Sequence, residues 1–182
     1  MTDSMPASAL DATPELKARL LEVLKLKEVP REGWRRVGVN RPESVAAHSW
    51  GVAWLVLVLC PPELNRERAL AMALLHDLAE ARVGDITPHD GVSAEDKAQR
   101  ERKALTALLA PLPHRDELTE LWEAYERGSD SEARLVKACD KLDMALQAQR
   151  YAGDGVDTAE FIASALKRLE LPLHRQLAEG LP

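Results

Sequence analysis

Hydrophobic side chains recur every three to four residues along most of the chain, the spacing that gathers them on one face of an α-helix. No stretch alternates between hydrophobic and polar residues as a half-buried strand would. The pattern therefore predicts an all-α fold, with six to eight helices packed around one core. The predicted helical segments are 14–27, 42–60, 66–84, 93–110, 114–127, 130–151 and 158–179, the last interrupted at Pro172.

Short polar residues and prolines mark the ends of several of these segments. Thr13 precedes a proline, which is favoured at the first position of a helix. Asn65 and Ser93 stand where N-cap residues are expected, because their side-chain oxygens can accept a free backbone N–H. Pro61 follows the second predicted helix and stops it.

A histidine interrupts the hydrophobic face of the second predicted helix. Val45, Val52, Leu55 and Leu59 form a stripe at helical spacing, and His48 falls inside that stripe. A single histidine in such a position is commonly a hydrogen-bonded core residue, so His48 alone indicates no particular chemistry.

The third predicted helix carries three ionisable residues close together. It is hydrophobic almost all round, so we expect it to be central. Leu70, Leu74 and Ala81 define one apolar face, and Asp77 falls on that face. His76 and Glu80 are four residues apart and therefore neighbours on one side of the helix. A buried carboxylate costs several kcal/mol unless it is paired or bound to a metal. A divalent cation bound by His48, His76 and Asp77 would offset that cost.

Two acids in the sixth predicted helix are candidates for a further ligand. Asp140 and Asp143 both lie near the apolar stripe that includes Cys139 and Leu142. Asp143 is nearer to this stripe, and it could instead pair with a polar neighbour or with another helix. Helical periodicity therefore leaves the choice between the two acids open.

Composition narrows the classes of function. The chain has 182 residues, of which 46% are hydrophobic and 30% charged, as expected for one globular domain at residues 13–182 with a flexible tail at residues 1–12. The net charge of −6 argues against a nucleic-acid polymer as partner, since that needs a basic surface. A small anionic substrate remains compatible, because a bound metal can dominate the local field.

No segment indicates a membrane or secreted protein. The longest apolar run, residues 51–60, is far shorter than the roughly 20 residues that span a bilayer. We find no signal peptide and therefore expect a cytoplasmic protein. The two cysteines, Cys60 and Cys139, lie in apolar runs and are expected to be free thiols.

Four stretches of the sequence resemble a known family. They are VPREGWRRVGVNRPESVAAHSW, LLHDLAEARVGDITP, SAEDKAQRERKAL and ELWEAYERGSDSEARLVKACDKLDMALQAQRY, which together cover roughly residues 16–152. The pattern of a histidine, a later His-Asp pair and a distal aspartate resembles the HD-domain phosphohydrolase superfamily. The combination HDLAEARVGDITP with RPESVAAHSW resembles its 5′-deoxynucleotidase branch, although Val37-Gly38 departs from the usual Arg-Asn of the eukaryotic relatives.

The resemblance implies a specific activity and metal site. It implies hydrolysis of deoxyribonucleoside 5′-monophosphates with a divalent ion such as Mn²⁺, Co²⁺ or Mg²⁺, in a homodimer. Another HD phosphohydrolase, acting on cyclic nucleotides or triphosphates, and a non-catalytic metal-binding helical module are the alternatives. The implied metal ligands are His48, His76, Asp77 and Asp140, which favours Asp140 over Asp143.

The other candidate site residues are expected to take part in proton transfer or in substrate binding. Glu80 and Asp85 are the non-ligand acids nearest in sequence, and we expect them to handle protons, with the acid and the base not distinguished. Arg31 is a candidate phosphate clamp, because a guanidinium can bind phosphate through two hydrogen bonds. Trp34 is a candidate for stacking on a base or sugar, or else packs the linker onto the second helix. Lys97 is expected on an exposed charged helix face.

Overall fold

A computed structural model describes residues 11–179, which fold into helices joined by turns and loops. This part contains no strand, only an isolated β-bridge between Pro30 and Ser44, so the all-α prediction is confirmed. Of the predicted tail, residues 1–10 lie outside the described part. The helices are α1 Pro14–Val23, the 3₁₀-helix η1 Leu24–Lys27, α2 Glu32–Arg36, α3 Val45–Leu59, α4 Arg66–Leu75, α5 Glu80–Val83, α6 Ala94–Leu109, α7 Arg115–Arg127, α8 Ser131–Gly153, α9 Ala159–Leu166 and α10 Pro172–Glu179.

The predicted helix starts are set by side-chain caps. Thr13, Asn65, Ser93 and Asp130 each accept a hydrogen bond from the backbone N–H three residues further on, at 2.8 to 3.0 Å. Such bonds satisfy a backbone donor that has no partner inside the helix. The helices therefore begin where the sequence places these short polar residues.

The third predicted helix is the main departure from expectation. It breaks after Leu75, and residues 76–79 form turns closed by i→i+3 bonds before α5 begins at Glu80. The face predicted from Leu74 is not the core face, because Leu74 is 59% exposed whereas Met72 and Ala73 are fully buried. The linker also contains α2. These short elements raise the number of α-helices within residues 11–179 to ten, above the predicted six to eight.

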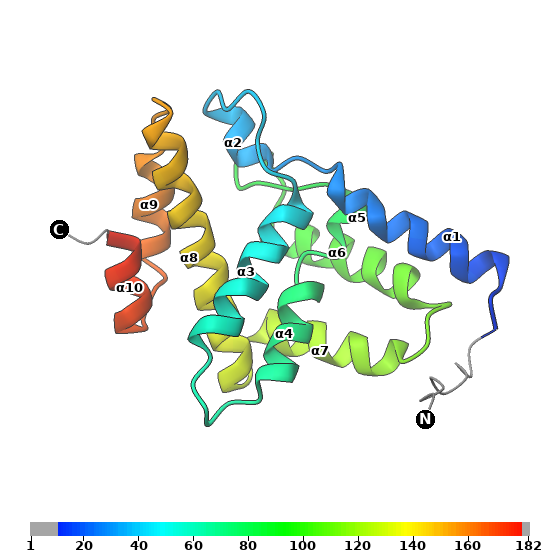
Figure 1. Ribbon diagram of the computed structural model, residues 1–182. Helices are drawn as coiled ribbons and strands as arrows, with labels where there is room; N and C mark the ends of the chain where they lie inside the picture. The colour runs from blue at the N-terminus through cyan, green and yellow to red at the C-terminus, as the bar shows by residue number, and fades with distance from the viewer. Residues whose placement is uncertain (1–10, 180–182) are drawn as a thin grey trace, which may run out of the picture.

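Helix α8 lies between α3 and the two C-terminal helices, α9 and α10 (Figure 1). It is 23 residues long and packs against α3 and α4 on one side and against α9 and α10 on the other. Its buried alanines, among them Ala145 and Ala148, let neighbouring helices approach closely. One core cluster joins Val52 and Val56 of α3, Met72 of α4 and Val136 of α8. The site residues therefore stand on helices held by a continuous core.

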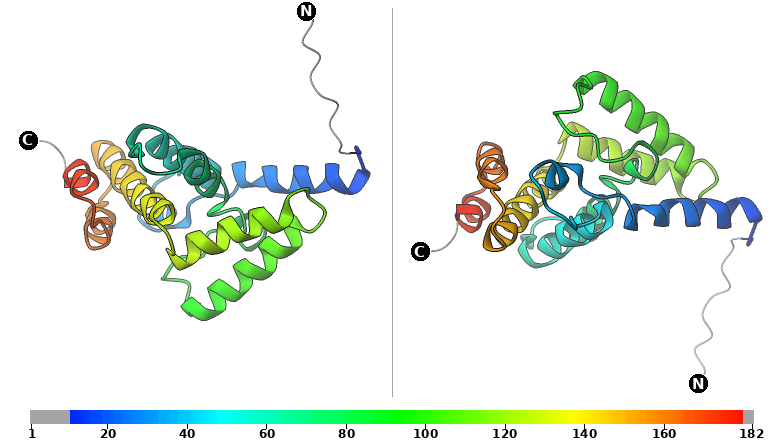
Figure 2. Two further views of the ribbon diagram at one scale, coloured as in Figure 1. Left: turned by 90° about the horizontal axis from the view of Figure 1, so that it is seen from below. Right: turned by 90° about the horizontal axis from the view of Figure 1, so that it is seen from above.

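Helix α1 projects from this body (Figure 2). None of its ten residues is buried, and Glu22 ties it to α5 by accepting hydrogen bonds from Arg82 at 2.6 and 3.0 Å. No helix in the described part of the chain is long and apolar enough to cross a membrane.

Candidate metal centre and active site

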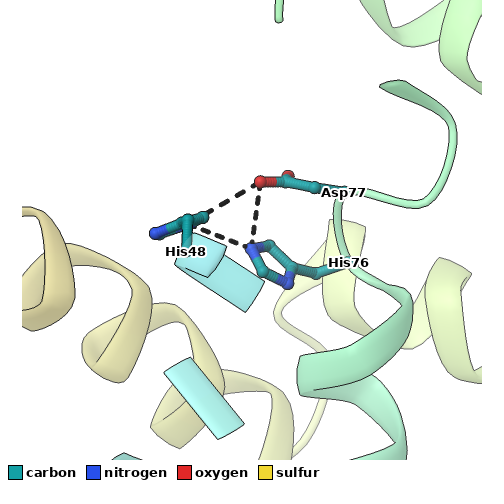
Figure 3. Close-up of side chains that lie close together, drawn as sticks. All are labelled: His48, His76 and Asp77. Atoms are coloured by element: carbon teal, nitrogen blue, oxygen red, sulfur yellow. Dashed lines mark hydrogen bonds and ion pairs between the residues drawn. The ribbon is translucent and has the colours of Figure 1, made fainter. Parts of the chain in front are cut away.

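Three side chains predicted as metal ligands meet at one point (Figure 3). His48 comes from α3, while His76 and Asp77 come from the break between α4 and α5. The Nε2 atoms of His48 and His76 are 3.4 Å apart. The Oδ2 atom of Asp77 lies 3.2 Å from His76 Nε2 and 3.7 Å from His48 Nε2. Donor atoms that share a cation at about 2.1 Å are roughly 3 to 3.5 Å apart. The spacing therefore suits a shared ion.

Asp140 adds a second carboxylate to this group. Its Oδ1 lies 3.4 Å from His48 Nε2, and the residue is 7% exposed on α8. The four side chains offer two imidazole nitrogens and two carboxylates, a mixed set that suits a divalent ion with open positions rather than a closed structural zinc site. The structure therefore brings three of the predicted ligands into one cluster and places the fourth, Asp140, next to that cluster in contact with His48.

Both histidines are oriented by a hydrogen bond at the opposite ring nitrogen. His76 Nδ1 donates to the carbonyl oxygen of Ala73 over 2.8 Å, so its Nε2 is left free to face the centre. His48 Nδ1 lies 2.7 Å from Asp143 Oδ2. A ligand histidine is usually held this way, by a carboxylate or carbonyl behind it.

The carboxylates of Asp140 and Asp77 are also held, by hydrogen bonds and by a contact with Arg31. Asp140 Oδ2 accepts hydrogen bonds from Tyr125 Oη at 3.2 Å and Lys141 Nζ at 2.8 Å, which leaves Oδ1 toward His48. Asp77 Oδ2 lies 3.4 Å from a guanidinium nitrogen of Arg31. Helical periodicity did not indicate this role for Tyr125, because only the packing of α7 against α8 brings the phenol to the acid.

Charge in the cluster sets the protonation of its members. Burial would raise the pKa of Asp77, but the neighbouring His76, His48 and Arg31 outweigh burial and hold that pKa far below its ordinary value. For Asp140, Lys141 and His48 outweigh burial in the same way and lower its pKa. Burial disfavours the charged form of His48, yet its contacts with the acids raise its pKa to about 9. Binding of a metal by His48 would thus release a proton.

Glu80 faces the same site with an unsatisfied oxygen. The residue is 3% exposed, and its Oε2 has no hydrogen-bond partner among residues 11–179. Burial, with the charges of Asp77 and Asp85, raises its pKa to about 10. A buried polar atom without a partner is costly, so its presence beside the donor cluster fits a site built to hold a cation or a polar ligand.

Asp85 and Arg31 connect the loop after α5 to α2. Asp85 Oδ2 accepts the backbone N–H of Glu32 at 2.7 Å, and its Oδ1 lies 3.8 Å from a guanidinium nitrogen of Arg31. Arg31 is therefore held between Asp77 and Asp85, with its pKa raised by these two acids despite burial. The structure places both predicted residues in the site.

Trp34 is part of the core beside the site. It is 2% exposed, packs on Tyr151 and Phe161 at ring distances of 5.2 and 4.2 Å, and donates its indole N–H to Glu43 at 3.0 Å. Trp34 therefore packs the linker, but onto α8 and α9 and not onto the second predicted helix, which corresponds to α3. Stacking on a substrate would need a free ring face, and its neighbours leave little of the ring open.

A groove of about 990 Å³ runs over the donor cluster. Lys97 was expected on an exposed face, but it is half-buried in this groove, where Nζ donates to the carbonyl of Ile86 at 2.9 Å and lies 3.5 Å from Glu101. A ligand in this groove would thus meet the positively charged side chains of Lys97 and Arg31 as well as the acidic side chains of the site. The site residues that line the groove are Arg31, His76, Asp77, Glu80, Asp85, Lys97 and Asp140.

Comparison with known proteins gives consistent matches. The sequence profile described as HD domain matches residues 23–179. Human 5′-deoxynucleotidase HDDC2 is 45% identical over 129 residues, covering 70% of this chain and 63% of the human protein. The Dictyostelium discoideum 5′-deoxynucleotidase HDDC2 is 35% identical over 170 residues, covering 85% of this chain and 90% of that protein. A solved structure of a conserved hypothetical protein from Pyrococcus furiosus is 37% identical with a TM-score of 0.76, covering 90% of this chain and 96% of that one.

Proposed function

We propose, from the premise that this chain belongs to the HD domain family, that it hydrolyses deoxyribonucleoside 5′-monophosphates to a deoxynucleoside and phosphate. The observation that carries the proposal is the convergence of two histidines and two aspartates beneath one groove. The curated relatives named above are called 5′-deoxynucleotidases, and the chain covers 90% of the one from Dictyostelium discoideum. It spans 63% of the length of the human protein.

His48, His76, Asp77 and Asp140 would hold the divalent ion, for which Mn²⁺, Co²⁺ and Mg²⁺ are the candidates. When bound, the ion would supply positive charge that offsets the phosphoryl charge and lowers the pKa of water. Two imidazoles and two carboxylates leave positions open on a six-coordinate ion of this kind.

Arg31 would bind the phosphoryl group. Its guanidinium borders the groove between Asp77 and Asp85, and its side chain keeps 17% of its surface exposed. A guanidinium can hold two phosphate oxygens at once, which fixes the orientation of the group as well as its charge. Asp77 and Asp85 hold Arg31 in place, so little reorganisation would accompany substrate binding.

Glu80 would transfer a proton. Burial and the neighbouring carboxylates raise the pKa of Glu80 to about 10, which favours the protonated form at neutral pH, and its Oε2 has no hydrogen-bond partner among residues 11–179. A protonated acid beside a departing 5′-oxygen can donate to it. Asp85 has one oxygen occupied by the N–H of Glu32, so in this proposal it contributes mainly through Arg31.

The test is phosphate release from a panel of nucleotides by the metal-loaded protein. The panel contains deoxy- and ribonucleoside 5′-monophosphates, triphosphates and cyclic nucleotides, each with Mn²⁺, Co²⁺ or Mg²⁺ added. Fastest turnover of deoxyribonucleoside monophosphates supports the proposal. Preference for triphosphates or cyclic nucleotides would overturn it in favour of another phosphohydrolase activity, and no turnover of any substrate would favour a non-catalytic metal-binding module.

The outer face of α3 supports a homodimer as the assembled form. Trp50 and Trp54, one turn apart, are 69% and 53% exposed, and Leu57 and Val58 extend the same apolar surface. Large exposed apolar patches mark interaction surfaces. We therefore propose that two copies of the chain pack through this face of α3.

A further inference from the structure

Asp143 lies between α3 and α8, on the side of His48 away from the metal centre. It stands one turn after Asp140 on α8, and its Oδ2 lies 2.7 Å from His48 Nδ1. The two acids therefore contact opposite nitrogens of one imidazole ring, Asp140 at Nε2 and Asp143 at Nδ1. Lys141 forms an ion pair with Asp140, whereas Asp143 is paired with His48.

A glycine makes room for this carboxylate. Gly51 lies within α3, three residues after His48, and a Cβ atom built on it would stand 2.0 Å from Asp143 Oδ1 and 2.9 Å from its Cγ. Such contacts are impossible, so any side chain at position 51 would push the carboxylate aside. Glycine in a helix interior is unfavourable relative to alanine, and here it permits a contact that alanine would exclude.

We infer that Asp143 is the positioning residue for His48 and that Gly51 is required for it to act. Asp143 accepts a hydrogen bond from the Nδ1–H of His48, which fixes the ring with Nε2 toward the cation and raises the basicity of Nε2. The inference rests on the metal site of the proposed function. Gly51 has no side chain that could bind a metal, so its effect on metal affinity operates through Asp143.

The test measures binding of Mn²⁺ alone to the metal-free protein by calorimetry, without nucleotide. We expect about 10- to 100-fold weaker binding in Asp143→Ala, the usual effect of removing such a partner. Asp143→Asn keeps an acceptor oxygen and should restore part of the affinity. Gly51→Ala should weaken binding to a similar extent, because the methyl group displaces Asp143.

The double variant separates positioning from a general loss of structure. In Asp143→Ala the carboxylate is absent, so adding Gly51→Ala should cause little further loss of affinity. Gly153→Ala is the matched control, since a Cβ there meets no described atom within 4 Å and should leave Mn²⁺ binding unchanged. Additive losses from Gly51→Ala and Asp143→Ala would overturn the inference, as would wild-type affinity in Asp143→Ala.

A spectroscopic measurement on the wild-type protein tests the inference even where the variants fail to fold. In the Zn²⁺-loaded wild-type protein, the Nδ1 proton of His48 should give a low-field NMR signal typical of a hydrogen bond to a carboxylate. Absence of that proton on Nδ1 would overturn the inference. A protein that binds Mn²⁺ in this Asp143-dependent way but hydrolyses no nucleotide would contradict the proposed function alone, whereas a wild-type protein that binds no Mn²⁺ would overturn both.

Discussion

The indole N–H of Trp122 donates to the backbone carbonyl of His76 over 3.1 Å. This bond joins α7 to the break between α4 and α5, where two of the proposed ligands lie. Trp122 is 2% exposed, and its ring packs in a cluster with Leu78 and Leu105. The bond therefore anchors the turn that presents His76 and Asp77.

Trp122→Phe should loosen this turn while keeping most of the packing. We expect the free energy of unfolding to fall by about 1 kcal/mol or more, because a buried carbonyl loses its donor. Mn²⁺ affinity should fall with it. Urea denaturation and calorimetry measure the two effects. Leu20→Ala, at a position 52% exposed on α1, is the control, and equal stability losses in the two variants would contradict the assignment.

Asp77→Asn should lower the metal content of the purified protein. The amide is neutral and a weaker ligand than the carboxylate, so the cluster loses one of its two negative charges. Elemental analysis after dialysis against a metal buffer measures the occupancy. Asp116→Asn removes an equal charge from a fully exposed side chain and should leave occupancy unchanged. Full occupancy in Asp77→Asn would count against this residue as a ligand.

Glu80→Gln should separate catalysis from metal binding. The amide preserves the volume of the side chain but cannot give up or take up the proton, so we expect kcat to fall by about 10² to 10⁴ while bound metal is retained. Initial rates with a deoxynucleoside monophosphate, together with metal analysis, test this. The exposed Glu120→Gln serves as control. Undiminished turnover in Glu80→Gln would remove it from the chemistry.

Charge on the outer face of α3 should disrupt the proposed dimer. Light scattering should give the wild-type protein about twice the chain mass of 20.1 kDa. Trp50→Glu combined with Trp54→Glu should give the mass of one chain, because two carboxylates would be buried unpaired at the interface. Leu173→Glu, at an exposed apolar position on α10, should stay dimeric. A monomeric wild-type protein would show that this surface has another role.

His174 should make the fold sensitive to mild acid. It is 3% exposed, and burial lowers its pKa below the ordinary value of 6.5, so it is neutral in the folded protein. As pH falls through about 6.5, the unfolded chain takes up this proton first, and the free energy of unfolding decreases until the lower folded pKa is reached. His174→Gln should therefore show a smaller decrease than wild type between about pH 7 and pH 5.

The control for this pH dependence is His89→Gln, because His89 is exposed. Urea denaturation at several pH values supplies the free energies. The wild-type protein and His89→Gln should lose stability in parallel. If His174→Gln lost stability in parallel with them as well, the buried imidazole would not be the group responsible.

The sequence alone determined the helical class and most helix boundaries. Thr13, Asn65 and Ser93 cap helices through contacts within a few residues, and such contacts do not depend on the rest of the chain. The position of His48 in an apolar stripe, followed by the pair His76-Asp77, likewise indicated a polar cluster inside the core. These features are local, so a pattern of period 3.6 is enough to reveal them.

Only the tertiary structure decided how the site is arranged. Periodicity could not separate Asp140 from Asp143, because both lie on the side of α8 that meets α3, and their roles differ by which nitrogen of His48 each one contacts. The burial of Trp34 likewise depends on α9, more than 120 residues further along the chain. Helical spacing tells which residues share a face, but what that face meets is set by contacts between helices that are distant in sequence.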